Sequence, residues 1–398
     1  MLKQFKNKNL LVISPHFKLF LREQITSIAS FFQKLTVMVP RPYFPSFLLN
    51  VPYINNKFPF LRSITESCKK ERLEKIDITF PKFFAFPLSI MRDRTLISCG
   101  HSISRMLKRN KIEFDIIHAH RLDIGFSGAL LKDHWGKPLI ITSHGSDVYE
   151  FPFRNNFTYA IVRYTLQRAD HVIAVCRSDA NKILSLGLNP RKLSLIPNGF
   201  NESLFSPLPQ RYARTKLGLL INKKILLSVG TLHEVKGHIY LIRAMYRISK
   251  IRNDVIAVII GSGPLEKKLR KEITKLGLDE SVILMGWEPH NRIPLWINAS
   301  DIFVLPSLNE GHPTVIAEAL GCGKPIIATK VGGIPETVIN EEIGLLIDPA
   351  DTQALTQAIN EALNKKWSTE KILEHAKNYS LSTITKRLFE IYKHYLHD

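Results

Sequence analysis

Short apolar runs alternate with amphipathic stretches along almost the whole chain. Residues 8–14 favour a β-strand, residues 17–32 carry apolar side chains at helical spacing, and residues 35–39 form the next apolar run. This order predicts a strand, a helix and a second strand. Further strands are predicted at residues 115–118, 138–142, 171–175 and 193–197. Short strands separated by helices pair in parallel and have both faces covered.

A second series of the same kind begins at residue 224. Its predicted strands are residues 224–229, 255–260, 282–285, 301–305, 325–329 and 344–347. Between the two series, Pro197-Asn198-Gly199 ends a strand and forms a turn. The predicted fold is therefore α/β, with two tandem Rossmann-like domains over residues 1–198 and 199–381 and an interdomain cleft. The ligand is expected in that cleft, at the carboxyl ends of strands.

Composition adds limits to this picture. The chain has 398 residues, of which 45% are hydrophobic, and this suits two globular domains. Its apolar runs are of strand length, far below the ~20 residues that cross a bilayer. The basic start is followed by an apolar run too short for a signal peptide, so a first strand is expected there. The four cysteines have no metal-type spacing, which favours a reduced, cytoplasmic protein.

Positive charge is concentrated in the first half of the chain. Residues 1–200 hold 30 lysines and arginines against 14 acids, a net of +16, and residues 201–398 hold 25 against 21, a net of +4. A basic half suggests an anionic partner, such as a membrane surface, a diphosphate-bearing lipid or nucleic acid. The alternative is a lysine-rich composition that only solvates the surface.

The segment from Pro306 to Ala319 is the most informative part of the chain. It places Glu310 and Glu318 eight residues apart, across the predicted start of a helix at Thr314. On a helical wheel this spacing separates the two acids by ~80°, so one can face a ligand over the helix N-terminus while the other reaches its flank. The free N–H groups of a helix N-terminus suit a phosphate, whereas carboxylates suit sugar and ribose hydroxyls.

With the following Gly323-Lys324-Pro325 and Gly332-Gly333 sequences, this segment resembles the donor site of retaining nucleotide-sugar glycosyltransferases. These enzymes have the GT-B fold and form family 4, whose E-x7-E motif Glu310 and Glu318 match. The resemblance implies sugar transfer from a UDP- or GDP-sugar to a glycan or lipid-linked acceptor, in cell-surface polysaccharide biosynthesis. It also implies retention without a metal or cofactor, and a C-terminal helix, residues 382–398, that packs back on the first domain.

A glycine-rich turn after the first strand of the second series carries Gly230, Thr231 and Lys236. Gly230 permits close backbone approach, and Lys236 supplies a mobile charge. The resemblance implies that Lys236 neutralises the leaving nucleoside diphosphate. Many relatives have arginine where this chain has Thr231, which makes Lys236 more critical. The alternative is a surface lysine before a helix.

Several further residues complete the predicted donor site. Gly261 and Gly263 form a phosphate-type turn, for which a plain strand-to-helix turn is the alternative. Trp287 stands where family members hold the nucleotide base, and a core position is the alternative. The remaining predicted donor-binding residues surround Glu310: Gly311, His312, Pro313 and Thr314.

The first half offers histidines at strand ends. His144 follows a strand in a Thr-x-His-Gly-x-Asp context that resembles the family's, where this histidine lies near the reacting sugar. A structural histidine is the alternative. His118, His120 and Asp147 are weaker candidates for the acceptor side. His118 and His120 share a strand face, yet no third ligand has metal-site spacing, so no metal is expected.

Two aromatic, proline-rich segments, residues 41–49 and 80–87, are predicted loops that dip into a membrane interface or line a lipid groove. Buried loop packing is the alternative. We expect a cytoplasmic protein, and the first interpretation of these segments would add a peripheral contact with the cytoplasmic face of the membrane. Two other function classes stay open: a nucleotide-sugar epimerase or hydrolase on the same scaffold, and a nucleic-acid-binding protein, for which the basic half shows no motif.

Overall fold

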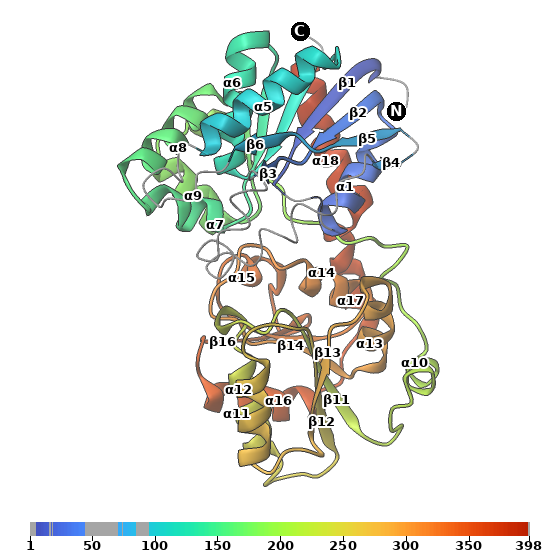
Figure 1. Ribbon diagram of the computed structural model, residues 1–398. Helices are drawn as coiled ribbons and strands as arrows, with labels where there is room; N and C mark the ends of the chain where they lie inside the picture. The colour runs from blue at the N-terminus through green and yellow to red at the C-terminus, as the bar shows by residue number, and fades with distance from the viewer. Residues whose placement is uncertain are drawn as a thin grey trace. The chain divides into compact units, whose positions relative to one another are not determined.

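The computed structural model describes residues 5–15, 17, 19–43, 71–73, 75–84 and 95–396 (Figure 1). The chain forms two compact units. The first comprises Met1–Val175, Asp179–Ile196 and Thr385–Asp398, and the second comprises Cys176–Ser178 and Pro197–Ile384. The main division thus lies two residues before the predicted boundary at residue 198.

The sheet of the first unit has eight strands in the order β10-β9-β8-β7-β1-β2-β5-β4. Neighbouring strands are parallel, except for the antiparallel pair of β4 and β5. The strands are β1 (Phe5–Ile13), β2 (Phe32–Met38), β4 (Glu71–Leu73), β5 (Ile76–Thr79), β7 (Ile116–His120), β8 (Leu139–Thr142), β9 (His171–Ala174) and β10 (Leu193–Leu195).

The helices of this unit connect successive parallel strands. They are α1 (Leu19–Ala29), α5 (Thr95–Arg109), α6 (Leu122–Trp135), α7 (Ser146–Tyr149), α8 (Asn156–Arg168) and α9 (Arg177–Ser185). The prediction of one helix as far as Phe32 was wrong, because α1 ends at Ala29 and Phe32 begins β2. Phe32 is buried and stacks on Phe5 of the neighbouring strand at 5.4 Å, so tertiary packing decided its conformation.

Two short strands, β3 (Arg41–Tyr43) and β6 (Lys82–Phe84), pair in parallel and form a separate small sheet. The sequence predicted loops in both places, and this was wrong for the described parts. Aromatic residues suit a pleated, half-buried surface, and the Arg41 N–H donates to the Pro81 carbonyl at 2.8 Å. Residues 44–49 and 85–87 of the two predicted loops lie outside the described residues.

The sheet of the second unit is fully parallel, in the order β13-β12-β11-β14-β15-β16. Its strands are β11 (Lys224–Val229), β12 (Val255–Ile260), β13 (Val282–Gly286), β14 (Ile302–Leu305), β15 (Ile326–Thr329) and β16 (Gly344–Ile347). Both faces are covered, because alternate residues of β12 enter two different hydrophobic cores. The strand order reverses between β11 and β14, which is where open α/β sheets bind ligands.

The helices of the second unit flank this sheet. They are α10 (Gln210–Leu217), α11 (His238–Ile248), α12 (Glu266–Lys275), α13 (Ile293–Ala299), α14 (Thr314–Gly321), α15 (Ile334–Thr337), α16 (Thr352–Asn364) and α17 (Thr369–Ala376). Short 3-10 turns, η4 (Glu234–Lys236) and η5 (His290–Arg292), lie in the loops after β11 and β13. Two Rossmann-like units in tandem confirm the predicted fold class.

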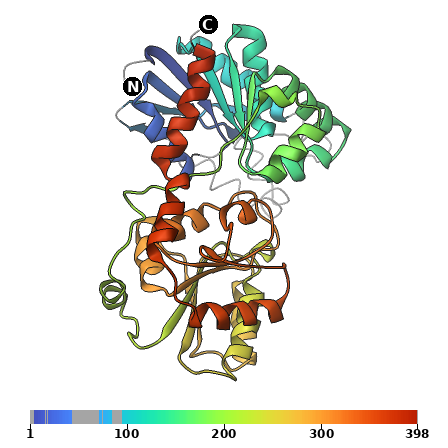
Figure 2. The ribbon, with the colours of Figure 1, turned by 180° about the vertical axis from the view of Figure 1, so that it is seen from behind.

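The last helix, α18 (Leu381–Leu396), belongs to the first unit from Thr385 onward. Figure 2 shows it from the side opposite to Figure 1, where it lies over the sheet of that unit. Tyr392 is fully buried, and Phe389 packs on Phe5 at 4.7 Å between ring centres. Within the described residues, no helix is both long and apolar enough to cross a bilayer.

Candidate functional site

Two loops of the second unit meet at the point where the strand order reverses. Strands β11 and β14 are neighbours, so the loops after them leave the same edge of the sheet. The Leu308 N–H donates to the Val235 carbonyl at 2.7 Å and ties the loops together. Gly237 has a φ of 65°, and a Cβ there would lie 1.9 Å from the Pro306 carbonyl oxygen. Only glycine allows the loops to approach this closely.

This approach brings Lys236 and Glu310 together, although 74 residues separate them in the chain. The Lys236 Nζ lies 2.6 Å from the Glu310 Oε1, which also accepts the Ser307 hydroxyl at 2.7 Å. The side chains of Lys236 and Glu310 are 22% and 10% exposed. Lys236 is therefore a paired, partly buried lysine, and its role toward a diphosphate stays a prediction.

Glu318 lies on α14 and is 7% exposed. Its Oε1 is 3.0 Å from the Nε2 of His290, which belongs to η5. Glu310 precedes the first residue of α14 by four positions, so both acids do not lie on one helix and the predicted ~80° between them does not apply. Sequence reasoning missed His290 and Ser307, since neither an isolated histidine nor an isolated serine carries a spacing signal.

Gly261 and Gly263 lie in the turn after β12, against the loop after β11. A Cβ on Gly261 would lie 1.9 Å from the Gly230 carbonyl oxygen, and one on Gly263 would lie 2.7 Å from that of Leu232. These two glycines therefore bring two loop backbones into contact. At Gly230 itself a Cβ would meet only the Lys236 and His238 side chains, at 3.6 Å, so the space beside its backbone is less restricted.

Trp287 follows β13 and is 70% exposed. The alternative interpretation of this residue as part of the core is therefore wrong. Thr231 is also exposed. Thr231 follows β11 and Trp287 follows β13, the two strands on either side of β12, so both residues stand in loops at the carboxyl edge of the sheet.

The predicted residues around the start of α14 divide into backbone and side-chain roles. His312 is buried, its Nε2 lies 3.1 Å from the Thr337 hydroxyl, and burial lowers the pKa of the ring to about 4. The Gly333 N–H donates to the Gly311 carbonyl at 2.7 Å. Pro313 caps α14 and Thr314 is its first residue. The His312 imidazole therefore packs inside the second unit. The start of α14 offers a ligand the first backbone N–H groups of the helix.

In the first unit, three histidines lie side by side at the carboxyl ends of β7 and β8. The rings of His118 and His120 stack with centres 4.4 Å apart, and the His120 Nδ1 lies 3.1 Å from the His144 Nε2. His118 also bonds the Tyr392 hydroxyl at 2.6 Å and the Thr142 hydroxyl at 2.8 Å. The structure thus joins all three predicted histidines in one column, anchored by the C-terminal helix.

These imidazoles are uncharged at neutral pH. Burial lowers the pKa of His118 to about 3 and that of His144 to about 4, and it holds the pKa of His120 well below its ordinary value. Desolvation disfavours the imidazolium, and for His144 the nearby Arg121 guanidinium lowers the pKa further. Throughout the described part of the chain, no group of three or more histidine, cysteine or acidic side chains is arranged to hold a metal ion.

Asp147 is fully buried beside this column. Its carboxylate accepts hydrogen bonds from the backbone N–H of His144 at 2.9 Å and the backbone N–H of Leu122 at 2.8 Å. Burial raises the pKa of this carboxyl group to about 6. Arg121 follows β7 with a φ of 85°, uncommon for a residue with a side chain. Its guanidinium bonds both carboxylate oxygens of Asp123, at 3.1 and 2.9 Å. Sequence reasoning missed Arg121, whose strained backbone has no sequence signal.

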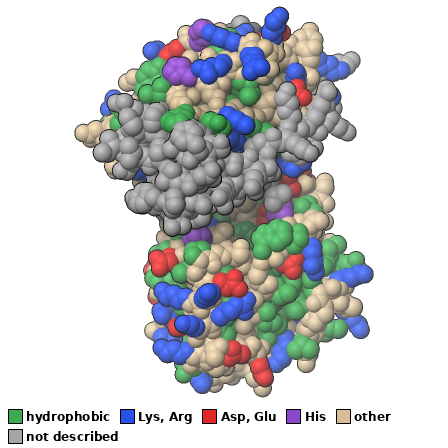
Figure 3. Space-filling model, in the orientation of Figure 1, with side chains coloured by type: hydrophobic (Ala, Val, Ile, Leu, Met, Phe, Trp, Pro, Cys, Tyr) green, Lys and Arg blue, Asp and Glu red, His purple; other side chains and the backbone are tan. Residues whose placement is uncertain are grey.

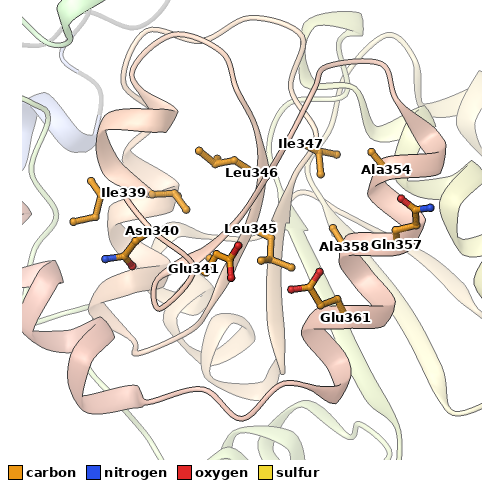
Figure 4. Close-up of a pocket in the computed structure, with 12 residues that line it drawn as sticks. Ile339, Asn340, Glu341, Leu345, Leu346, Ile347, Ala354, Gln357, Ala358 and Glu361 are labelled. Carbon is orange, nitrogen blue, oxygen red and sulfur yellow. The ribbon is translucent and has the colours of Figure 1, made fainter.

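A separate cavity of about 420 Å³ lies along β16 and α16. Figure 4 shows Glu341 and Glu361 on its wall beside Leu345. None of the predicted site residues lines this cavity. It is therefore distinct from the arrangement at the β11 and β14 loops.

The chain matches two family descriptions. Residues 39–204 match Glycosyltransferase Family 4, and residues 210–379 match Glycosyl transferases group 1. The chain is 26% identical to D-inositol 3-phosphate glycosyltransferase of Mycobacteroides abscessus, over 81% of this chain and 72% of the relative. It is also 26% identical to the putative teichuronic acid biosynthesis glycosyltransferase TuaC of Bacillus subtilis, over 90% of this chain and 88% of the relative.

Solved structures share the fold. Sucrose-phosphate synthase from Thermosynechococcus elongatus superposes with a TM-score of 0.79 at 21% identity, covering 97% of this chain and 98% of that one. HepE from Anabaena, solved in complex with UDP and glucose, gives a TM-score of 0.72 at 21% identity, covering 97% and 99%. The chain belongs to the group 1 glycosyltransferases, family 4, and has the GT-B fold.

Proposed function

We propose that this glycosyltransferase takes a sugar from a UDP- or GDP-sugar and attaches it, with retained anomeric configuration, to a glycan or lipid-linked acceptor. Its place is the synthesis of a cell-surface polysaccharide at the cytoplasmic face of a membrane. The observation that carries the proposal is the Lys236–Glu310 pair at the strand-order reversal of the second unit. The name of TuaC supports the acceptor class, and the UDP complex of HepE supports the donor class.

Lys236 and the start of α14 supply positive charge to the same place. The diphosphate of the donor lies between the Lys236 ammonium and the first N–H groups of the helix, where both stabilise the charge that develops as the phosphate leaves. Donor binding releases Lys236 from Glu310, and Glu310 then accepts hydrogen bonds from hydroxyls of the donor sugar. This charge comes from the chain itself, so the proposed reaction needs neither a metal nor another cofactor.

Glu318 and Trp287 hold the nucleoside in this proposal. The His290 ring fixes one oxygen of the Glu318 carboxylate, and the other oxygen accepts the ribose hydroxyls. Trp287 is exposed and offers an aromatic face to the base. The Gly230 and Thr231 backbone, with the turn of Gly261 and Gly263, forms the remaining wall beside the phosphates.

The histidine column serves the acceptor side. An uncharged His144 can accept a hydrogen bond from an acceptor hydroxyl, and His120, at 3.1 Å, orients its ring. Asp147 fixes the backbone of His144. No residue takes the role of a covalent nucleophile, so the acceptor attacks from the face that the diphosphate leaves, and the leaving phosphate takes the acceptor proton.

A thermal-shift panel with UDP, GDP, ADP and CMP tests the donor site. Wild type and Glu280→Ala, which changes an exposed acid of the same unit, should gain a higher melting midpoint with one nucleoside diphosphate, and Glu318→Ala should not. No shift with any nucleotide in wild type would overturn the proposal. Consumption of the matching nucleotide-sugar without any acceptor would instead favour a hydrolase or an epimerase.

A further inference from the structure

Helix α5 of the first unit has one polar, basic face. Its buried side consists of Cys99, Ile103 and Leu107, which enter the core of the unit. The opposite side carries hydroxyl and basic residues at helical spacing: Ser98, His101, Ser102, Arg105, Lys108 and Arg109. The bases among them are exposed.

No acid balances these bases within the helix. From Thr95 to Ile112 the sequence has no aspartate or glutamate. Across the described residues, Arg105, Lys108 and Arg109 form no ion pair with an acid. Helix α12 of the second unit is a contrast, because there Arg270 pairs with Glu266 at 2.9 Å. The positive charge of α5 is therefore not neutralised within the described structure, and it faces solvent.

Two hollows flank the basic side of α5, and Arg105 and Arg109 line both. One, of about 460 Å³, also includes Lys82 of β6, and the other, of about 700 Å³, includes His101 and Lys108. Strand β6 is fixed to the helix, because the Ser102 hydroxyl donates to the Lys82 carbonyl at 2.6 Å. The basic surface thus continues from the helix onto the small sheet.

Apolar side chains stand beside these bases. Tyr43 and Phe84 are register partners in the small sheet and are 45% and 39% exposed, and Ile97 of α5 is 36% exposed. The Phe84 N–H donates to the Ser98 hydroxyl at 3.1 Å, which holds this aromatic edge against the helix. Exposed aromatic and aliphatic groups within a basic surface suit the boundary between lipid headgroups and acyl chains.

We propose that this surface, formed by α5 and the β3–β6 sheet, docks the protein on an anionic lipid bilayer. Figure 3 shows lysine, arginine and histidine side chains on the part of the first unit that carries α5 in Figure 1. Each base near the bilayer adds to binding, and the apolar groups enter the interface. Ile97 favours a bilayer over nucleic acid, because an aliphatic side chain offers a nucleic-acid base no aromatic ring to stack on. The proposal does not depend on the proposed donor or acceptor.

Vesicle co-sedimentation of the full chain tests this docking. Wild type should bind vesicles of phosphatidylcholine with phosphatidylglycerol, bind pure phosphatidylcholine weakly, and be released by salt. Arg105→Glu/Arg109→Glu should weaken binding about tenfold or more. The matched control, Lys267→Glu/Lys268→Glu on α12, changes net charge equally at exposed lysines of the other unit and should keep binding within about twofold of wild type.

An equal loss of vesicle binding in both double variants would overturn the assignment of this surface, because the net charge of the protein alone would then explain the binding. Weak wild-type binding to anionic vesicles together with salt-sensitive binding to duplex DNA would overturn the bilayer as partner. The melting midpoint of Arg105→Glu/Arg109→Glu without any ligand serves as the folding check. A retained midpoint with lost vesicle binding supports docking by α5, whereas vesicle binding that persists in Glu318→Ala separates docking from the donor site.

Discussion

The carboxyl edges of the two sheets carry different chemistry. At the edge of the second unit, Lys236 and Glu310 form a charged pair whose lysine is 22% exposed. At the edge of the first unit, the buried His118 and His120 and the partly buried His144 form an uncharged column. One edge is arranged to exchange a charged partner, and the other is arranged to hold neutral hydrogen-bonding groups in place.

Burial explains this difference. A charged pair whose lysine still reaches water can exchange its partner, provided that the ligand supplies hydrogen bonds to the largely buried Glu310 carboxylate. A buried imidazole keeps its position only as the neutral form, since desolvation penalises the cation. The comparison therefore fits a phosphate leaving from the charged edge and a neutral hydroxyl held at the uncharged edge. Five predictions can break or sharpen it.

The largest effect is expected from Lys236→Ala. Turnover should fall about 10²–10³-fold, because this ammonium stabilises the leaving diphosphate. Steady-state sugar transfer with saturating donor measures the effect. Lys267→Ala, which changes an exposed lysine of α12, should keep wild-type turnover. Wild-type turnover in Lys236→Ala would show that the charge of Lys236 does not stabilise the leaving diphosphate.

Gly237→Ala should separate the two loops of the charged edge. A φ of 65° strains alanine, and the added Cβ would overlap the Pro306 carbonyl at 1.9 Å. We expect a loss of about 2–4 kcal/mol in unfolding free energy, with weaker nucleotide binding. Gly218→Ala is the matched control, because Gly218 has a φ of 66° but a Cβ there would meet nothing within 4 Å. Equal losses in both variants would mean that loop contact contributes nothing beyond backbone strain.

The uncharged edge should make the first unit sensitive to acid. The folded pKa of His118, about 3, lies below its ordinary value of 6.5, so the unfolded chain binds the proton first. Stability is full above pH 6.5 and falls as the pH drops below it, by about 2 kcal/mol between pH 7 and pH 5 for this histidine. His118→Gln should flatten the decline of the melting midpoint over that range.

Asp147 contributes with the opposite sign. Its folded pKa, about 6, lies above the ordinary 3.8, so this group adds stability as the pH falls from 6 toward 3.8. Asp147→Asn should therefore steepen the acid decline that His118→Gln flattens. His134→Gln, at an exposed histidine of the same unit, should leave the slope unchanged. A wild-type slope in His118→Gln would contradict the neutral column.

The smallest effect is expected from His290, which acts through Glu318. His290→Ala should weaken nucleotide affinity about fivefold, because the carboxylate loses one oriented contact at 3.0 Å. Isothermal titration with the nucleoside diphosphate measures this change. His290→Gln, which keeps a donor, should recover part of the affinity. An equal loss in both variants, without the recovery, would indicate that the ring only packs against Phe205.

The sequence predicted the alternation of strands and helices well, because period and run length are local properties. The helix from Thr314 to Gly321 was predicted with its first residue correct, and the second-unit strands were predicted within one or two residues. Errors occurred where packing overrides propensity. Phe32 became a strand residue, and parts of the two aromatic segments paired as β3 and β6.

The candidate site was predictable as residue types and positions but not as contacts. The E-x7-E spacing singled out Glu310 and Glu318, whereas their partners Lys236 and His290 are fixed by loops that meet only in the folded unit. Arg121 and Tyr392 could not be found from the sequence. Backbone strain at one residue and a bond that joins residues 274 positions apart leave no local pattern.

The sequence by itself determined the fold class, the family, the uneven charge and the identity of the groups at the strand ends, because each depends on residue type and spacing. Tertiary structure decided which of those groups meet and in which charge state. Lys236 pairs with Glu310 because Gly237 lets two loops touch. The histidines are neutral because the fold buries them, and burial depends on the whole packed unit.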